Sequence, residues 1–245
     1  MKTIAFILIT LISGAIAGTI LGLINQLLAE PYIDRAIEIE VQNRETSGEI
    51  VDHNELVQYR SWQKGGAIVA GAILGTSLSA LFGIVYAYSR DSLPGSNNKK
   101  KSVVLAGIMF LVIFFIPMLK YPANPPVVGD PETIEFRESL YISMLVISGF
   151  SALGVALLYR ILGRTQRELR KIIVPVIYIV IIALAFAFLP ANPDEITITS
   201  DLLMNFRIIT TITMGIFWGI MGILLGSFWD VVKPHETKAP KLSTL

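Results

Sequence analysis

Three arginines occupy equivalent places in the sequence, each close to the start of a long apolar segment. They are Arg60, Arg137 and Arg207. The acidic residues nearest to them on the preceding loops are Glu30, Asp130, Glu132, Asp194 and Glu195. A cation at the N-terminal end of a helix opposes the helix dipole and therefore needs a nearby anion. One interpretation is structural, with each arginine bound to an acid of its own hairpin and to carbonyls that prolines leave free. The alternative is a ring of arginines that gates an outer vestibule or receives an anion.

Two proline-rich loops contain a second set of candidate residues, because the sequence P-A-N-P ends both the third and the fifth apolar segment. The shared positions are Pro122, Asn124, Pro125, Pro190, Asn192 and Pro193. Proline fixes φ and removes an amide donor, which makes both loops rigid. After the first of them, Asp130-Pro131-Glu132 is typical of a helix N-terminus. Asn124, Asp130 and Glu132 also offer oxygen atoms of the kind that divalent cations bind. The loop could therefore serve either as a rigid cap of the hairpin or as a site for a divalent cation.

The long loop between the first two apolar segments holds a cluster of metal-ligating side chains. The cluster consists of Glu49, Asp52, His53 and Glu55. Cobalt, nickel and zinc accept imidazole and carboxylate ligands. A single histidine in an acidic, exposed loop is more often hydrated, so the metal site is a hypothesis beside that simpler interpretation. His235, near the C-terminus, is a weaker candidate.

Other kinds of chemistry are excluded by what the sequence lacks. It contains no cysteine, which excludes disulfides, thiolate metal sites and cysteine nucleophiles. It has no P-loop, dinucleotide-binding fingerprint, H-E-x-x-H motif or nucleophile motif. A formal net charge of +1 also argues against a nucleic-acid-binding surface. We therefore expect neither an enzyme, nor a permanently bound cofactor, nor a nucleic-acid partner.

The composition is that of a polytopic membrane protein. Hydrophobic residues make up 53% and charged residues only 16%, with a mean hydropathy of +0.63, whereas soluble domains average about 25% charged residues. Six segments contain no charged residue, and about 20 helical residues are enough to cross a bilayer. They are 3–29, 65–89, 102–119, 139–159, 172–193 and 208–229. We predict an all-α membrane protein with six transmembrane helices.

The charges of the connecting loops predict the orientation. The N-terminus, the tail and two alternate loops together hold 13 Lys and Arg residues but only 4 acidic ones. The other three loops hold 7 Lys and Arg residues and 15 acidic ones. Because positive residues remain on the cytoplasmic side, we predict both termini in the cytoplasm and the acidic loops outside, in the plasma membrane.

The sequence also contains an internal repeat. After each P-A-N-P, the dipeptide Phe-Arg opens the next apolar segment, and a glycine follows twelve residues after the arginine. Glu30-Pro31 and Arg60 form a looser copy of the same pattern. We predict one membrane domain over 1–245, made of three parallel hairpins, 1–90, 102–164 and 172–230, with an amphipathic and acidic outer loop 30–64 and a cytoplasmic tail 231–245. A duplication of two hairpins beside an unrelated first hairpin is the alternative.

Glycines recur three or four residues apart in the first, second and sixth apolar segments, and the fourth segment contains Gly149. The recurring glycines of the other three segments are Gly14, Gly18, Gly22, Gly71, Gly75, Gly215, Gly219, Gly222 and Gly226. Small residues with this spacing share a helix face and allow backbones to approach closely in a membrane. We predict that these positions pack helices, with a glycine-lined conduit as the less favoured alternative.

The segment 120–134 reads K-Y-P-A-N-P-P-V-V-G-D-P-E-T-I. This motif resembles the CbtA family of probable cobalt transporter subunits, and in particular its archaeal and actinobacterial branch. Glu30-Pro31, and Arg60 with Gln63, are also similar to that family. The resemblance implies a plasma-membrane protein linked to cobalt or cobalamin metabolism, with Co²⁺ as the transported ion. It also implies a small, single-span CbtB-type partner with a histidine-rich end.

Two functional hypotheses follow. The first is a six-helix transport component that moves or gates a divalent cation, which enters between the P-A-N-P caps and the arginines. The second is a scaffold or accessory subunit that does not transport and that binds partner helices along its glycine faces. Lipid handling at the outer leaflet is a third option that no motif supports. We expect membrane lipids around the protein, and the sequence is compatible with a homo-oligomer.

Overall fold

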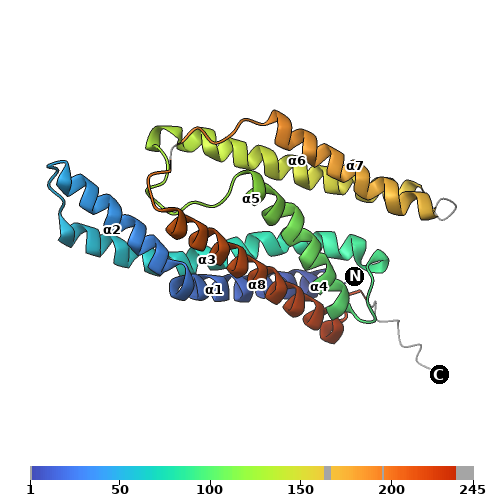
Figure 1. Ribbon diagram of the computed structural model, residues 1–245. Helices are drawn as coiled ribbons and strands as arrows, with labels where there is room; N and C mark the ends of the chain where they lie inside the picture. Colours follow the sequence, from blue (N-terminus) through green and yellow to red (C-terminus); the bar gives the residue numbers. More distant parts are fainter. Residues whose placement is uncertain (1, 163–166, 195, 236–245) are drawn as a thin grey trace, which may run out of the picture. The chain divides into compact units, whose positions relative to one another are not determined.

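The computed structural model describes residues 2–162, 167–194 and 196–235, and this part of the chain is helical without strands (Figure 1). The α-helices are α1 (Thr3–Leu28), α2 (Glu30–Thr46), α3 (His53–Ser89), α4 (Asn98–Met109), α5 (Ile116–Lys120), α6 (Ile134–Ile161), α7 (Arg167–Phe188) and α8 (Ser200–Val232). Two 3₁₀ turns, η1 (Arg90–Ser92) and η3 (Pro131–Thr133), and a π-helix, η2 (Phe110–Phe115), complete the set.

Within these residues, six helices are long and apolar enough to cross a membrane, which confirms the predicted all-α class and the number of spans. The helix ends differ from those of the predicted apolar segments: several helices begin earlier, whereas α7 ends at Phe188, before the predicted end at 193. The second span belongs to a helix that begins at His53, because Asp52 caps it by accepting hydrogen bonds from the backbone N–H groups of Asn54 (2.9 Å) and Glu55 (3.2 Å). A helix of 37 residues is about 55 Å long, and the hydrocarbon core is about 30 Å thick. Its polar first turns therefore extend past the core.

The chain forms two compact units, and each is described by itself. The first takes in the described residues of Met1–Glu30, Ile50–Met109 and Ile212–Leu245. The second consists of Pro31–Glu49 and the described residues of Phe110–Thr211. The boundaries fall inside the third and sixth spans, so the division of the chain into three hairpins stays a prediction.

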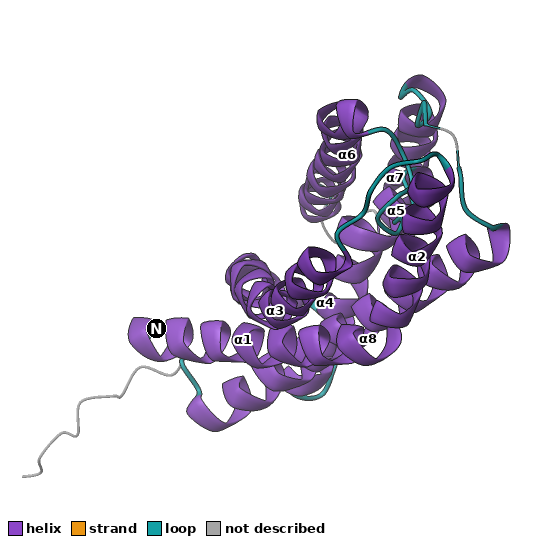
Figure 2. Ribbon diagram, turned by 90° about the vertical axis from the view of Figure 1, so that its left-hand side faces the viewer, coloured by secondary structure: helices purple, strands orange, loops and turns teal. Residues whose placement is uncertain are grey.

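In the first unit, α1 and α3 lie side by side (Figure 2). Their contact is made by the predicted glycines. A β-carbon at Gly18 would meet the Gly71 carbonyl, and one at Gly14 would meet Ser79 and the Gly75 carbonyl. Because these neighbours are mostly backbone atoms, only glycine permits this approach. The close approach of the two backbones is the geometry that the predicted packing role of these glycines requires.

The second half of α8 packs against α4 in the same unit. A β-carbon at Gly222 would lie 2.7 Å from that of Ala106, and one at Gly226 would lie 2.5 Å from the Lys99 Cα. The Asp230 carboxylate accepts hydrogen bonds from the backbone N–H groups of Asn98 (3.2 Å) and Lys99 (3.1 Å) and so satisfies donors at the start of α4.

Two predicted glycines, one on α6 and one on α8, differ from this pattern. Outside its own helix, no described atom lies within 4 Å of a β-carbon built on Gly149 or Gly219. These two glycines therefore do not pack against a described helix of this chain, and their role in packing helices stays a prediction. Gly215 is half-buried on α8.

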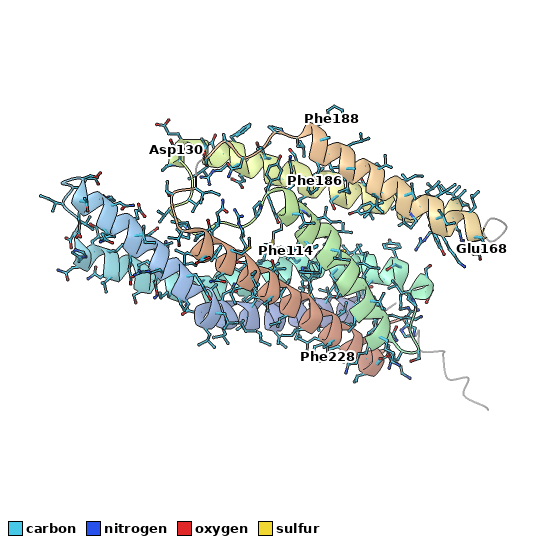
Figure 3. The ribbon with its side chains drawn as sticks, viewed as in Figure 1. Phe114, Asp130, Glu168, Phe186, Phe188 and Phe228 are labelled. Atoms are coloured by element: carbon cyan, nitrogen blue, oxygen red, sulfur yellow. The ribbon has the colours of Figure 1, made fainter. Side chains whose placement is uncertain are left out.

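In the second unit, α6 contacts η2, α5 and α7. Figure 1 shows α6 and α7 running alongside each other. The apolar core here is formed by Tyr121, Leu140, Met144 and Ala185. Figure 3 places Asp130 and Phe188 toward one end of the α6–α7 pair and Glu168 at the other. The loops that hold the candidate residues thus gather at a single end of this pair.

Candidate functional site

The second unit has a pocket of about 830 Å³ beside the first P-A-N-P loop. Span three lines it with the π-helix residue Phe114, labelled in Figure 3, and with Met118. The 121–131 loop and the first half of α6 form most of the remaining wall. Its polar side chains are Glu40, Tyr121, Asn124, Arg137, Glu138, Tyr141 and Asn192. The pocket brings together Asn124, Asn192 and Arg137, three of the residues selected from the sequence.

Arg137 holds the two proline-rich loops together. Its Nε lies 2.8 Å from Asp194 Oδ2, at ion-pair distance but without hydrogen-bond geometry. Its other two nitrogens donate to the carbonyls of Val128 and Asp130, both at 3.1 Å. The Asp194 side chain is only 4% exposed and also accepts from the Thr133 hydroxyl at 2.8 Å. The expected arginine–acid pair exists, but the acid comes from the 189–199 loop and not from Asp130 or Glu132.

Two residues of the 121–133 loop have left-handed backbone conformations. Gly129 has φ +101°, and a β-carbon there would collide with both Asp194 and Arg137. Glycine is therefore required by the backbone and by the ion pair together. Val127, which lines the pocket, has φ +85°. This conformation is strained for a β-branched residue, by about 1–3 kcal/mol, so the loop is held in shape by its neighbours.

Arg207, at the start of the sixth span, is bound to the first P-A-N-P loop. Its guanidinium donates to Asn124 Oδ1 at 2.7 Å and to the Ala123 carbonyl at 3.3 Å. The carbonyl contact agrees with the structural interpretation, since prolines leave such carbonyls without helical partners. The acids predicted to pair with Arg207 are Asp194 and Glu195. Asp194 pairs with Arg137 instead, and Glu195 lies outside the described residues.

The second P-A-N-P is joined to the first by Tyr121. The Tyr121 hydroxyl donates to the Pro190 carbonyl at 2.6 Å, and Lys120 Nζ donates to the Phe186 carbonyl at 2.9 Å. Burial raises the pKa of the Tyr121 phenol, so the hydroxyl stays protonated as a donor. Further along, Asn192 Oδ1 accepts from the Asp194 backbone N–H at 3.2 Å, while Pro193 is exposed.

Arg60 makes the pair that the sequence predicts, in the first unit. It donates to Glu30 Oε2 at 2.5 Å and to Gln63 Oε1 at 2.7 Å. Both charged side chains are almost buried, with 13% and 12% exposure. Pro31 follows in the first turn of α2, where its missing amide hydrogen costs nothing.

The predicted helix start at Asp130 is confirmed. Its carboxylate accepts from the Glu132 backbone N–H at 2.9 Å, Pro131 takes the first position, and η3 leads directly into α6. Pro122 and Pro125 are partly and fully buried in the same loop, and Glu132 is exposed. Asp130 is therefore engaged as a cap.

The acidic cluster of the long loop is not assembled into a metal site. No group of three or more His, Cys, Asp or Glu residues within the described ranges could hold a metal ion. Glu49 pairs with Arg44 at 2.7 Å, and Asp52 caps α3. His53 and Glu55 are exposed in the first turn of that helix.

Two carboxylates of the pocket were not found from the sequence. Glu40 belongs to α2, and Glu138 follows Arg137 on α6. No motif marks them, because only the fold brings α2 to the 121–133 loop. Asp194 pairs with Arg137, so the two glutamates are additional carboxylates of the lining. Basic side chains lie near it as well, since Arg44 interacts electrostatically with Glu40 and Arg207 bonds Asn124 of the wall. The carboxylate oxygens are of the kind that divalent cations bind.

Comparison with known proteins gives one match. The model of the family described as "Probable cobalt transporter subunit (CbtA)" matches residues 3–230. No curated protein and no solved structure matches the chain.

Proposed function

This chain belongs to the CbtA family of probable cobalt transporter subunits, and we propose that it is a membrane subunit that admits a divalent cation, cobalt, through the pocket of its second unit. The observation that supports this most directly is the pair of carboxylates, Glu40 and Glu138, on a pocket whose arginine is neutralised by Asp194. The proposal includes a link to cobalamin metabolism and a small CbtB-type partner with a single span, as the family resemblance implies.

The proposed orientation places the pocket on the outside of the plasma membrane. The 30–64, 120–138 and 194–207 segments carry 15 acidic residues, whereas the termini and the other loops carry the excess of Lys and Arg. With both termini in the cytoplasm, the two P-A-N-P loops face the external solution. The acidic surface around them raises the local cation concentration before entry.

The chemistry of the pocket fits a hydrated cation. Besides the guanidinium of Arg137, which pairs with Asp194, its polar groups supply carboxylate, amide and hydroxyl oxygens, and the described lining contains no imidazole or thiolate. Cobalt binds oxygen ligands more weakly than nitrogen or sulfur ligands. A site of this kind concentrates the hydrated ion and releases it readily, which transport requires. It does not store the metal.

Uptake of Co²⁺ into proteoliposomes tests the proposal. The purified chain is reconstituted alone and with a CbtB-type partner, with Ni²⁺, Mn²⁺ and Zn²⁺ as competitors. Saturable uptake above that of empty liposomes is the expected result. Absence of uptake from folded protein in both preparations would overturn the transport function.

The alternative function, a scaffold that does not transport, is favoured by a separate observation. A side chain at Gly149 or Gly219 would meet no described atom within 4 Å, so each leaves room for the close approach of a helix from another protein. Substituting leucine at these positions would then prevent copurification of a partner. The transport function instead predicts that uptake depends on Glu40 and Glu138.

A further inference from the structure

Three oxygen atoms meet deep inside the second unit, away from the pocket. The Ser148 hydroxyl of α6 donates to the Val112 carbonyl of η2 at 2.6 Å. The same hydroxyl lies 2.9 Å from the Tyr178 hydroxyl of α7. Ser148 is fully buried. Three elements from separate spans thus each direct one neutral oxygen toward a common point.

The backbone is irregular on both sides of this point. Val112 belongs to the six-residue π-helix Phe110–Phe115, which interrupts the third span between α4 and α5. A π-helical turn disturbs the regular i→i−4 bonding and is frequent at functional sites. On the other side, α7 contains Pro175, three residues before Tyr178, and proline removes a further helical hydrogen bond. Interrupted helices supply backbone carbonyls as ion ligands near the middle of the membrane in many transporters.

The position of the cluster agrees with such a role. Ser148 lies near the middle of the predicted span 139–159. Tyr141, which lines the pocket, is seven residues earlier on the same helix, and Met144 lies between them on the same face. Seven residues correspond to about 10 Å along a helix. The other side of the pocket reaches Phe114, two residues from Val112. Along α6 the cluster therefore lies about two helical turns beyond Tyr141, and along the third span it lies next to the end of the pocket.

We infer that the Val112 carbonyl and the Ser148 and Tyr178 hydroxyls form a binding site for a monovalent alkali cation, such as sodium. All three ligands are hard oxygens, as such ions prefer, and all are uncharged. The predicted spans contain no charged side chain, and burying two positive charges without a counter-charge is far more costly than burying one. To bind the ion, Ser148 turns its proton away from the Val112 carbonyl and Tyr178 turns its proton away from Ser148, so that all three oxygens present lone pairs.

A purely structural role makes a different prediction. Ser148 would then only join three helices by hydrogen bonds, as polar side chains do in membrane bundles. Its removal would lower stability by the same amount in any salt. A cation site links stability to the concentration of the ion, because a ligand of the folded state raises the apparent melting temperature. The dependence on sodium therefore distinguishes the two roles.

The test measures thermal unfolding of the purified full chain in detergent. NaCl is titrated against N-methyl-D-glucamine chloride at constant ionic strength, and KCl and LiCl are titrated in the same way. No cobalt is present, so the result does not depend on the proposed transport function. Ser148→Ala and Tyr178→Phe each remove one ligand. Ser139→Ala is the matched control, because Ser139 is an exposed hydroxyl of α6 that bonds the carbonyl of Phe136 in its own helix (2.7 Å).

The expected result is a melting temperature that rises and saturates with one alkali cation. Ser148→Ala and Tyr178→Phe should need at least about tenfold more of that ion, which corresponds to about 1.4 kcal/mol, while Ser139→Ala keeps the response of the unmodified chain. If Ser148→Ala fails to fold, Tyr178→Phe provides the test, because it removes only the hydroxyl and keeps the aromatic ring. The inference is overturned if every alkali ion acts like N-methyl-D-glucamine, or if Tyr178→Phe leaves the half-saturating concentration unchanged.

Discussion

Replacing Asp194 by asparagine removes the carboxylate that faces Arg137 and keeps nearly the same shape. The Asp194 side chain is 4% exposed, and Arg137 retains 24% exposure. The arginine keeps its bonds to the carbonyls of Val128 and Asp130. The substitution therefore leaves a largely buried cation with polar neighbours but without a counter-charge.

The expected loss of stability follows from this geometry. Removing one partner of a fully buried ion pair costs about 3–5 kcal/mol. Because Arg137 is partly solvated and has two carbonyl partners, we expect about 2–3 kcal/mol for Asp194→Asn. For a chain of this size, each kcal/mol changes the melting temperature by about 2–4 °C, so the transition should fall by about 4–12 °C.

Thermal unfolding in detergent, followed by circular dichroism, measures this change. Asp201→Asn is the matched control: it makes the same charge change at an exposed position in the first turn of α8. It should lower the transition by no more than about 4 °C, since a helix-dipole contact at the surface is worth about 0.3–1 kcal/mol.

A double-mutant cycle adds a second criterion. Arg137→Gln combined with Asp194→Asn should lose less than the sum of the two single changes, with a coupling of at least about 1 kcal/mol. Equal melting temperatures for Asp194→Asn and Asp201→Asn, or strict additivity in the cycle, would refute the view that this pair holds the two loops together.

Two further predictions concern helix packing and the Tyr121 hydroxyl. Gly18→Ala should destabilise the chain by about 1–3 kcal/mol, because the new methyl group would overlap the Gly71 carbonyl. Gly149→Ala should leave thermal stability unchanged or slightly raised. An equal loss of stability in both variants would contradict the close packing of α1 against α3. Tyr121→Phe should cost about 1–2 kcal/mol through the lost bond to Pro190. Because the pKa of Tyr121 is raised above 10.0, its contribution should be complete below pH 10 and decline as pH rises further. The free energies of unfolding of the unmodified protein and of Tyr121→Phe, measured against pH, should therefore converge at high pH. A difference between them that does not change with pH would exclude ionisation of the phenol as the cause.

The number of spans could be predicted from the sequence because each apolar segment is long and free of charge. The ends of the helices could not, since polar residues extend them. The helix that contains the second span begins at His53, where Asp52 caps it, whereas the apolar segment begins at residue 65. Capping and backbone hydrogen bonding decide such boundaries, and hydropathy does not report them.

The partners of the arginines were predictable in kind but not in identity. The helix dipole requires compensation near Arg137 and Arg207, and each has a polar partner from a P-A-N-P loop region. Which loop supplies it depends on how the loops cross, so Asp194 contacts Arg137 and Asn124 contacts Arg207. Sequence proximity favoured Asp130, which is used instead as a helix cap.

The π-helix had no signal in the sequence. Phe110–Phe115 reads F-L-V-I-F-F, which is equally suited to a regular transmembrane helix. Ser148 and Tyr178 are ordinary hydroxyl residues until the fold brings them to the Val112 carbonyl. The pocket carboxylates also have no signal in the sequence. Glu40, for example, reaches the pocket only because of the position of α2 within the second unit.

The most direct test of the central claim is the concentration dependence of Co²⁺ uptake after both pocket carboxylates are neutralised. Glu40→Gln combined with Glu138→Gln should raise the half-saturating Co²⁺ concentration by at least about tenfold, because each charge attracts a divalent ion with about 1 kcal/mol in a hydrated site. Glu135→Gln, an exposed acid on α6 outside the pocket, should leave that concentration unchanged. An unchanged value in the double variant, or an equal increase with Glu135→Gln, would contradict entry of the cation through this pocket.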